Sequence, residues 1–167
     1  RSTLSSSSVF SANGVSSASA LLIAWAWPRT APRSWTSQVL KRWRVTGSNV
    51  FGVNDDALLE YPFAYMSEPG SWRPTEPEVE GFRRYLLKGG FVVFDDFRGE
   101  DWTNLRNQMA QVLPDLRFRP LTGRESVFHA FFEIPDLTVL KAPYGGFEAE
   151  YWGLFEENDP AKRLVAV

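Results

Sequence analysis

The chain has 167 residues, of which 44% are hydrophobic and 15% are aromatic, with one His and no Cys. This length supports one domain with a proper core and is short for two domains of ordinary size. The absence of Cys excludes disulfides, thiolate zinc sites and cysteine nucleophiles, and a single His excludes a multi-histidine metal site. Any metal would therefore have to be bound by carboxylates, and we predict no metal-ligating residues.

The formal net charge of -2 is unevenly divided along the chain. Residues 1–54 contain six basic residues and no acidic one, whereas residues 55–167 contain twelve basic and twenty acidic residues, a net charge of -8. Binding to a nucleic-acid backbone requires clustered Lys and Arg side chains. We therefore predict no nucleic-acid partner, because six dispersed basic residues are weak support for one.

Residues 1–33 form a Ser-rich segment with an apolar run from Ala18 to Trp27. A transmembrane helix needs about 20 apolar residues, so this run is too short and we predict no membrane span. A buried strand and a surface-anchoring segment are both compatible with the run. We predict an irregular N-terminal segment over 1–33 and an α/β domain over 34–167.

The domain is predicted to begin with a helix over 34–47, where Val39 and Trp43 share helical spacing and a glycine provides the stop. A short strand over 49–53 follows, and then a turn or a single helical turn over 55–60. No internal repeat is visible in the sequence.

The next segment reads as one α/β unit, with a strand over 63–66, a helix and a second strand over 91–94. Thr75 and Glu78 have the spacing of a capping box, so the helix is expected to begin near Glu76 and to end at a glycine pair. The second strand is a continuous apolar run, which is typical of a parallel strand covered on both faces. This segment predicts the α/β fold class.

A further helix begins at Asp101, with one apolar face and with Asn, Gln and Arg side chains that we expect to face water. Short strands are then predicted over 116–118, 138–140, 151–155 and 163–167. A flexible turn is expected over 144–147. The two glycines of that turn lack GxGxxG spacing and a following helix, so we predict no nucleotide and no other cofactor.

Asp95 and Asp96 directly follow the second strand of the α/β unit, at the carboxyl edge of an open sheet, where ligands usually bind. The alternative is that they cap the following loop or helix by accepting backbone N–H bonds. Adjacent residues on an extended strand point to opposite sides, so both cannot easily chelate one ion. The ligand-binding residues that we predict at this edge are Ser67, Glu68, Gly70 and Asp96.

His129 stands among Phe residues in the sequence VFHAFF. A lone His in such a setting is more often a core or hinge residue than a catalyst. No Ser in a GxSxG elbow accompanies it, so a catalytic triad is not predicted. His129 stays a candidate catalytic residue only together with carboxylates of the sheet edge.

The aromatic side chains, 13 Phe, 7 Trp and 5 Tyr, either fill the core or cover a partner. Exposed Trp side chains that gather on a flat face are typical of a protein interface. We predict Trp72, Trp102 and Trp152 as interface residues.

Several segments resemble an uncharacterised bacterial family, the domain of unknown function DUF4159, over about residues 61–167: YPFAYMSEPG, EVEGFRRYLLKGGFVVFDDF, the helix with QMAQVLPD, VFHAFF, and YWGLF with RLVAV. The resemblance implies a flavodoxin-like or glutamine-amidotransferase-like fold and, in many members, export to the bacterial cell envelope. It supplies no established activity. We therefore expect a single flavodoxin-like domain, with a mainly parallel sheet covered by helices on both faces.

Three functions are compatible with these observations. The first is a non-catalytic binding or accessory subunit on the periplasmic side of a bacterial cell-envelope assembly, associated with the membrane through partner protein subunits. The second is a hydrolase or carbohydrate-directed enzyme that uses Glu68, Asp95, Asp96 and His129. The third is a small-ligand sensor at the sheet edge. Clustering of the carboxylates with His129 would favour the last two, and exposed Trp side chains would favour the first.

Overall fold

The computed structural model describes residues 21–25, 48–130, 132–134, 136–140 and 148–167. Two helices lie within these residues, α1 (Glu76–Leu87) and α2 (Glu100–Val112). The strands of the described part are β1 (Leu21–Trp25), β2 (Ser48–Gly52), β3 (Phe63–Ser67), β4 (Phe91–Asp95), β5 (Arg119–Pro120), β6 (Trp152–Phe155) and β7 (Leu164–Ala166). The fold is mixed α/β, as expected from the α/β unit.

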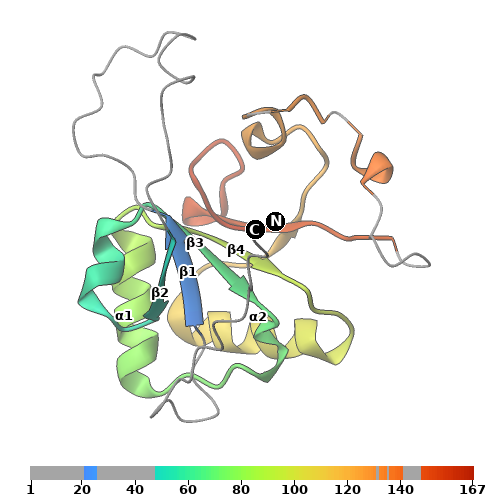
Figure 1. The fold of residues 1–167 in the computed structure, drawn as a ribbon. Helices are drawn as coiled ribbons and strands as arrows, with labels where there is room; N and C mark the ends of the chain where they lie inside the picture. Colours follow the sequence, from blue (N-terminus) through green and yellow to red (C-terminus); the bar gives the residue numbers. More distant parts are fainter. Residues whose placement is uncertain (1–20, 26–47, 131, 135, 141–147) are drawn as a thin grey trace, which may run out of the picture.

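The strands form a sheet in the order β2-β1-β3-β4-β7-β6-β5. Figure 1 labels the first four of these strands, β2, β1, β3 and β4. β4 pairs in parallel with β3 and β7, whereas the other four pairings of the described strands are antiparallel. The expectation of a mainly parallel sheet therefore does not hold for the described pairings. Parallel neighbours need a long crossover such as α1, and the short turn between β6 and β7 permits only antiparallel pairing.

The start of α1 confirms the predicted capping box. The backbone N–H of Thr75 donates to the carboxylate of Glu78 at 2.7 Å, and the Thr75 hydroxyl donates to the same carboxylate at 2.8 Å. At the other end, the guanidinium of Arg163 donates to the backbone oxygens of Leu86 at 3.0 Å and of Gly90 at 3.1 Å. A side chain from the residue before β7 thus contacts carbonyls at the C-terminal end of α1 and just beyond it.

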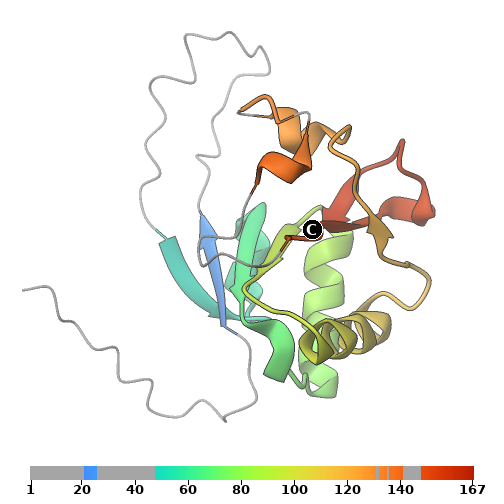
Figure 2. The same cartoon turned by 90° about the vertical axis from the view of Figure 1, so that its right-hand side faces the viewer.

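Both helices pack on one face of the sheet (Figure 2). Ala64 and Met66 of β3 face the same core as Phe82 of α1 and Leu105 of α2. We expected helices on both faces. Instead, Leu121 and Phe128 form a second, smaller core with Phe155 of β6, and Ile134, Leu137 and Leu164 pack against it.

Two predicted strands are not strands in the structure. β5 occupies Arg119–Pro120 rather than 116–118, because Leu116 and Phe118 pack against the main core from irregular chain. Residues Leu137–Val139 form a 3₁₀ turn, since the Asp136 carboxylate accepts the Thr138 backbone N–H at 2.9 Å and caps it.

The N-terminal predictions have different outcomes. β1 lies within the apolar run for which a strand was one of two alternatives, and it pairs with both β2 and β3, so the sheet begins before residue 34. The predicted helix over 34–47 and the predicted turn over 144–147 lie outside the described residues. The domain boundary at residue 34 stays a prediction.

Candidate functional site

The carboxyl edge of the parallel strands gathers four of the predicted site residues. Ser67 and Asp95 are register partners at the ends of β3 and β4, and the Glu68 backbone N–H donates to the Asp95 carbonyl at 2.9 Å. Asp96 follows directly, and all four side chains are exposed. We call Ser67, Glu68, Asp95 and Asp96 the edge row.

Asp95 is the most contacted member of the edge row. One carboxylate oxygen accepts the Tyr65 hydroxyl at 2.9 Å, and the other accepts the Asp96 backbone N–H at 2.8 Å, as in the capping alternative. The pKa values of Tyr65 and Tyr151 are both raised. Burial is the largest cause in each case, and the negative charge of the nearby Asp95 adds to it. Both phenols therefore stay protonated at neutral pH, and Tyr65 donates its hydroxyl to this carboxylate.

Tyr65 and Tyr151 were missed by the sequence reasoning. Tyr65 lies two residues before Ser67 on β3, so strand alternation places both on one face, next to Asp95. The two-residue spacing of Tyr65 and Ser67 could have predicted this arrangement from the sequence. Tyr151 precedes β6, which is antiparallel to β7, and this pairing brings it to the same edge from far along the chain.

Two members of the edge row have left-handed backbone conformations, Glu68 with φ 52° and Asp96 with φ 61°. Such a conformation costs a residue with a side chain about 1–2 kcal/mol. Residues held in this way cluster at functional sites, where the surrounding structure maintains them. The edge row is therefore a candidate functional site on backbone geometry as well as on topology.

Replacing Glu68 by Gly is expected to raise the free energy of unfolding by about 0.5–1 kcal/mol, because glycine adopts this conformation without strain. Urea denaturation followed by circular dichroism measures the change. Glu68→Ala is the matched control, since it removes the carboxylate and keeps the strained β-carbon. If alanine stabilises as much as glycine, charge repulsion and not backbone strain is the cause.

His129 does not join the edge row. Its Nδ1 lies 2.8 Å from a Glu133 carboxylate oxygen and its Nε2 lies 2.8 Å from the Gly123 carbonyl. Its side chain is 31% exposed, so the apolar setting expected from the flanking Phe residues is only partial. Its described partners all belong to the segment over 121–134. The described hydrogen bonds of His129 therefore hold it to its own segment and reach no carboxylate of the edge row, and its grouping with those carboxylates stays a prediction.

The imidazolium form of His129 donates to both of its partners, and this contact predicts a pH dependence. The Glu133 carboxylate, and then the Gly123 carbonyl, raise the pKa of His129 above its ordinary value. Its stabilising contribution is therefore complete below the ordinary pKa of about 6.5 and is lost as the pH rises through the folded value. NMR titration of the imidazole checks this, and Glu133→Gln is expected to lower the pKa. A His129 pKa that Glu133→Gln leaves unchanged contradicts the contact.

The three predicted interface tryptophans separate into two environments. Trp72 is only 2% exposed and lies edge-on to Phe82 at 5.6 Å, so its assignment to an interface is wrong. Trp102 and Trp152 are half-buried and their rings lie 5.3 Å apart. Phe97 and Phe118 also contact Trp102, at 6.1 Å and 4.9 Å. We call Phe97, Trp102, Phe118 and Trp152 the aromatic cluster.

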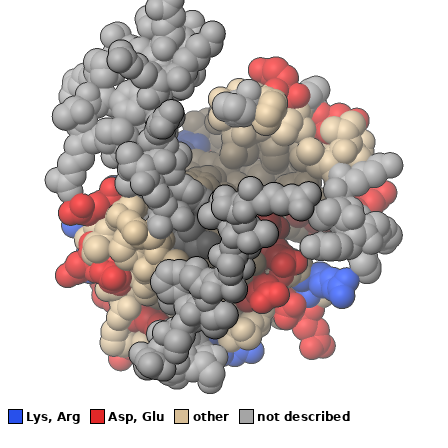
Figure 3. Space-filling model, viewed as in Figure 1, with Lys and Arg blue, Asp and Glu red and all other residues tan. Residues whose placement is uncertain are grey.

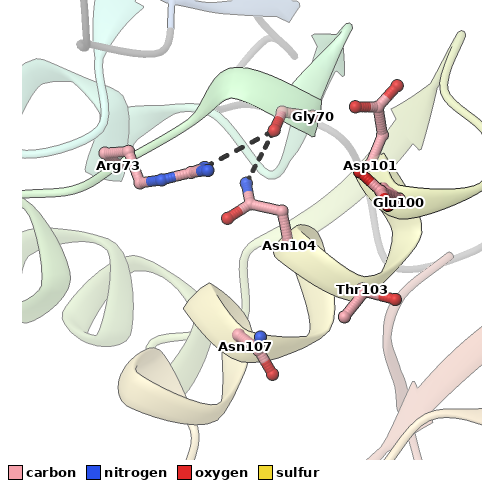
Figure 4. A pocket seen from close by; sticks show the side chains of 7 residues that line it. All are labelled: Gly70, Arg73, Glu100, Asp101, Thr103, Asn104 and Asn107. Atoms are coloured by element: carbon pink, nitrogen blue, oxygen red, sulfur yellow. Dashed lines mark hydrogen bonds between the residues drawn. The ribbon is translucent and has the colours of Figure 1, made fainter.

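A pocket of about 480 Å³ opens between the loop after β3 and the start of α2 (Figure 4). Its lining residues are Gly70, Arg73, Glu100, Asp101, Thr103, Asn104 and Asn107. Among the residues predicted to bind a ligand, Gly70 lines this pocket, whereas Ser67, Glu68 and Asp96 lie in the neighbouring edge row. The structure thus divides the predicted ligand site into two.

One protein-family model matches residues 24–167, that of the domain of unknown function DUF4159. The chain belongs to the DUF4159 family. The match extends the resemblance seen over about residues 61–167 towards the N-terminus, into β1. No curated protein matches the chain.

Asn104 organises the pocket of this DUF4159 domain. Its side-chain N–H group donates to the carbonyls of Gly70 at 2.9 Å, Trp72 at 3.0 Å and Pro69 at 3.3 Å. Gln108 donates to the Asn104 side-chain oxygen at 2.9 Å. We expected the polar residues of this helix to face water, and Asn104 instead fastens the loop after β3 to α2.

The described part of the DUF4159 domain contains neither a candidate metal cluster nor a membrane-spanning helix. In that part, no group of three or more His, Asp or Glu side chains is placed to hold a metal ion. Neither described helix combines the length and the apolar character needed to cross a membrane. On the face shown in Figure 3, acidic side chains are more prominent than basic ones.

Proposed function

We propose that this DUF4159 domain is a non-catalytic binding module, an accessory subunit on the periplasmic side of a bacterial cell-envelope membrane assembly. Its partners are protein subunits that hold it at the membrane. The observation that carries the proposal is the pairing of Trp102 with Trp152, at 5.3 Å, in a partly buried aromatic cluster beside the edge row. A flavodoxin-like relationship is part of the proposal and is supported by the parallel β3-α1-β4 unit.

The chemistry of the edge favours binding over catalysis. A general acid or base needs a partner within hydrogen-bond reach of the reacting group. His129 is bound to Glu133 and Gly123 in its own segment, and both carboxylate oxygens of Asp95 accept hydrogen bonds from within the fold. The Asp95 carboxylate is therefore held as part of a polar surface.

The aromatic cluster has the composition of an interface centre. Trp and Tyr are enriched among the residues that dominate binding energy, because they bury a large area at small entropic cost. The edge row would then form a polar rim, where charges set orientation and association rate more than affinity. Binding should accordingly weaken as salt concentration rises.

Co-purification from membranes under mild detergent tests this proposal. The wild-type domain is expected to carry a stoichiometric membrane partner, and Trp152→Ala is expected to lose it while the domain stays folded by circular dichroism. Leu87→Ala is the matched control, because Leu87 is 68% exposed on α1 and lies outside the aromatic cluster. Equal recovery of the partner with Trp152→Ala, or recovery of the wild-type domain alone, contradicts the proposal.

A hydrolase or carbohydrate-directed enzyme is the second candidate, because Glu68, Asp95 and Asp96 do lie together at the edge. Turnover of an oligosaccharide panel that Asp96→Asn abolishes, with thermal stability unchanged, would favour it over the binding module.

A further inference from the structure

The pocket beside α2 carries charges of opposite sign on its two walls (Figure 4). Arg73 lies on the side of the loop after β3, and Glu100 and Asp101 lie at the start of α2. Within the described part of the chain, none of these three side chains forms a salt bridge. One guanidinium and two carboxylates therefore face the same hollow without neutralising one another.

The two walls are held in place before any ligand arrives. Asn104 ties α2 to the carbonyls of the loop, including Gly70 and Trp72. One terminal nitrogen of the Arg73 guanidinium donates to the Trp72 carbonyl at 2.8 Å and lies 3.4 Å from that of Gly70. The guanidinium is thus anchored through one nitrogen, and its remaining N–H groups have no described partner. Such preformed polar groups are what a small-molecule site needs.

Gly70 lets the acidic wall come close to the loop. A β-carbon at this position would lie 2.2 Å from the Asp101 side-chain carbon Cγ, so the Asp101 side chain lies directly against the glycine. The carboxylate of Asp101 and the guanidinium of Arg73 therefore flank the same short stretch of backbone (Figure 4).

The lining selects a ligand by charge. The described lining side chains are all polar, so an apolar ligand would bury little apolar area there. The carboxylates of Glu100 and Asp101 would repel an anion, and the guanidinium of Arg73 would repel a cation. A zwitterion is complementary to both walls. Its carboxylate can accept two hydrogen bonds from the guanidinium, and its ammonium can pair with the carboxylates of the other wall.

We infer that this pocket binds a small zwitterion of the α-amino-acid class, a property that does not depend on the proposed partner binding. The pocket volume of about 480 Å³ leaves room for a ligand of this size. Thr103 and Asn107 supply a hydroxyl and an amide for any polar group that the ligand carries beyond its α-carbon.

NMR titration of the full chain with the common L-amino acids, each added singly, tests the inference. At least one is expected to shift the side-chain amide signals of Asn104 and Asn107 saturably. Its N-acetyl form, which lacks the ammonium, and its amide form, which lacks the carboxylate, are expected to bind about tenfold or more weakly. Saturation by none of the amino acids, or equal binding of the blocked forms, overturns the inference. Methyl glucoside saturating in their place would identify a polyol site and overturn it too.

Variants assign the binding to this pocket. Arg73→Gln and Asp101→Asn are each expected to weaken binding about tenfold or more, because each removes a charge-assisted contact. Arg106→Gln is the matched control. Arg106 lies on α2, as Asp101 does, but its guanidinium lies over the ring of Trp102 and does not line the pocket. If both pocket variants bind the amino acid with wild-type affinity, the amino acid binds outside this pocket and the inference is overturned. Loss of the membrane partner with Trp152→Ala is a separate result, so either proposal can fail alone.

Gly70→Ala is expected to abolish the saturable shifts, because the new methyl group displaces the Asp101 side chain from the pocket wall. The thermal midpoint should fall only slightly, since Asp101 is exposed and its side chain can rotate away. Wild-type affinity in this variant contradicts the role given to Asp101.

Discussion

Replacing Trp72 by Ala is expected to lower the free energy of unfolding by about 3–5 kcal/mol, the usual cost of removing a buried Trp. Trp72 is 2% exposed, lies edge-on to Phe82 and belongs to the main core. Trp152→Ala should cost clearly less, because Trp152 is half-buried at the edge of the sheet. Urea denaturation followed by circular dichroism compares the two variants without relying on Trp fluorescence.

Trp72→Phe separates the packing of this ring from its polar atom. The indole nitrogen of Trp72 is buried and has no hydrogen-bond partner among the described residues, so phenylalanine removes an unsatisfied donor while keeping most of the ring. Its cost is expected to stay below about 2 kcal/mol. A larger loss for Trp152→Ala than for Trp72→Ala would contradict the placement of Trp72 in the core.

Asn104→Ala is expected to lower the free energy of unfolding by about 2–4 kcal/mol. The variant removes the donor shared by three carbonyls of the loop after β3, and the Gly70 and Trp72 carbonyls then keep only Arg73 as a side-chain donor. The same change opens the pocket, so amino-acid binding should be lost with it. Thermal and urea denaturation measure the stability, and the NMR titration measures the binding.

Two variants make the Asn104 result specific. Asn107→Ala, one turn along the exposed side of α2, should change stability by less than about 0.5 kcal/mol. Asn104→Asp should be at least as destabilising as alanine, because a carboxylate would face three carbonyl oxygens. A fully stable Asn104→Asp protein would contradict the three hydrogen bonds.

The local parts of the fold were predictable from sequence. The capping box of Thr75 and Glu78 and the glycines after α1 act within a few residues, and the structure has α1 where they placed it. The position of Asp95 and Asp96 at the carboxyl edge also followed, because a strand's end determines which edge its next residues occupy.

The rest depends on contacts between residues far apart in sequence. Asn104 bonds carbonyls that lie 32 to 35 residues earlier in the chain, and no pattern within a helix distinguishes it from a solvated Asn. Trp72 is a core residue because α1 folds back against the loop after β3 and packs Phe82 on the Trp72 ring. The antiparallel pairings of β1 and β6 are likewise set by which strands become neighbours, which apolar runs do not reveal.

The central claim is that the carboxyl edge of the sheet contacts a protein partner. A photo-cross-linking amino acid placed at Asp96, in the protein within its native envelope, tests this contact most directly. The matched position is Leu87, at the end of α1 and therefore at the opposite edge of β3 and β4. We predict a cross-link to a membrane-assembly subunit from position 96 and none from position 87. Cross-links from position 87 alone, or from neither position, would contradict the claim.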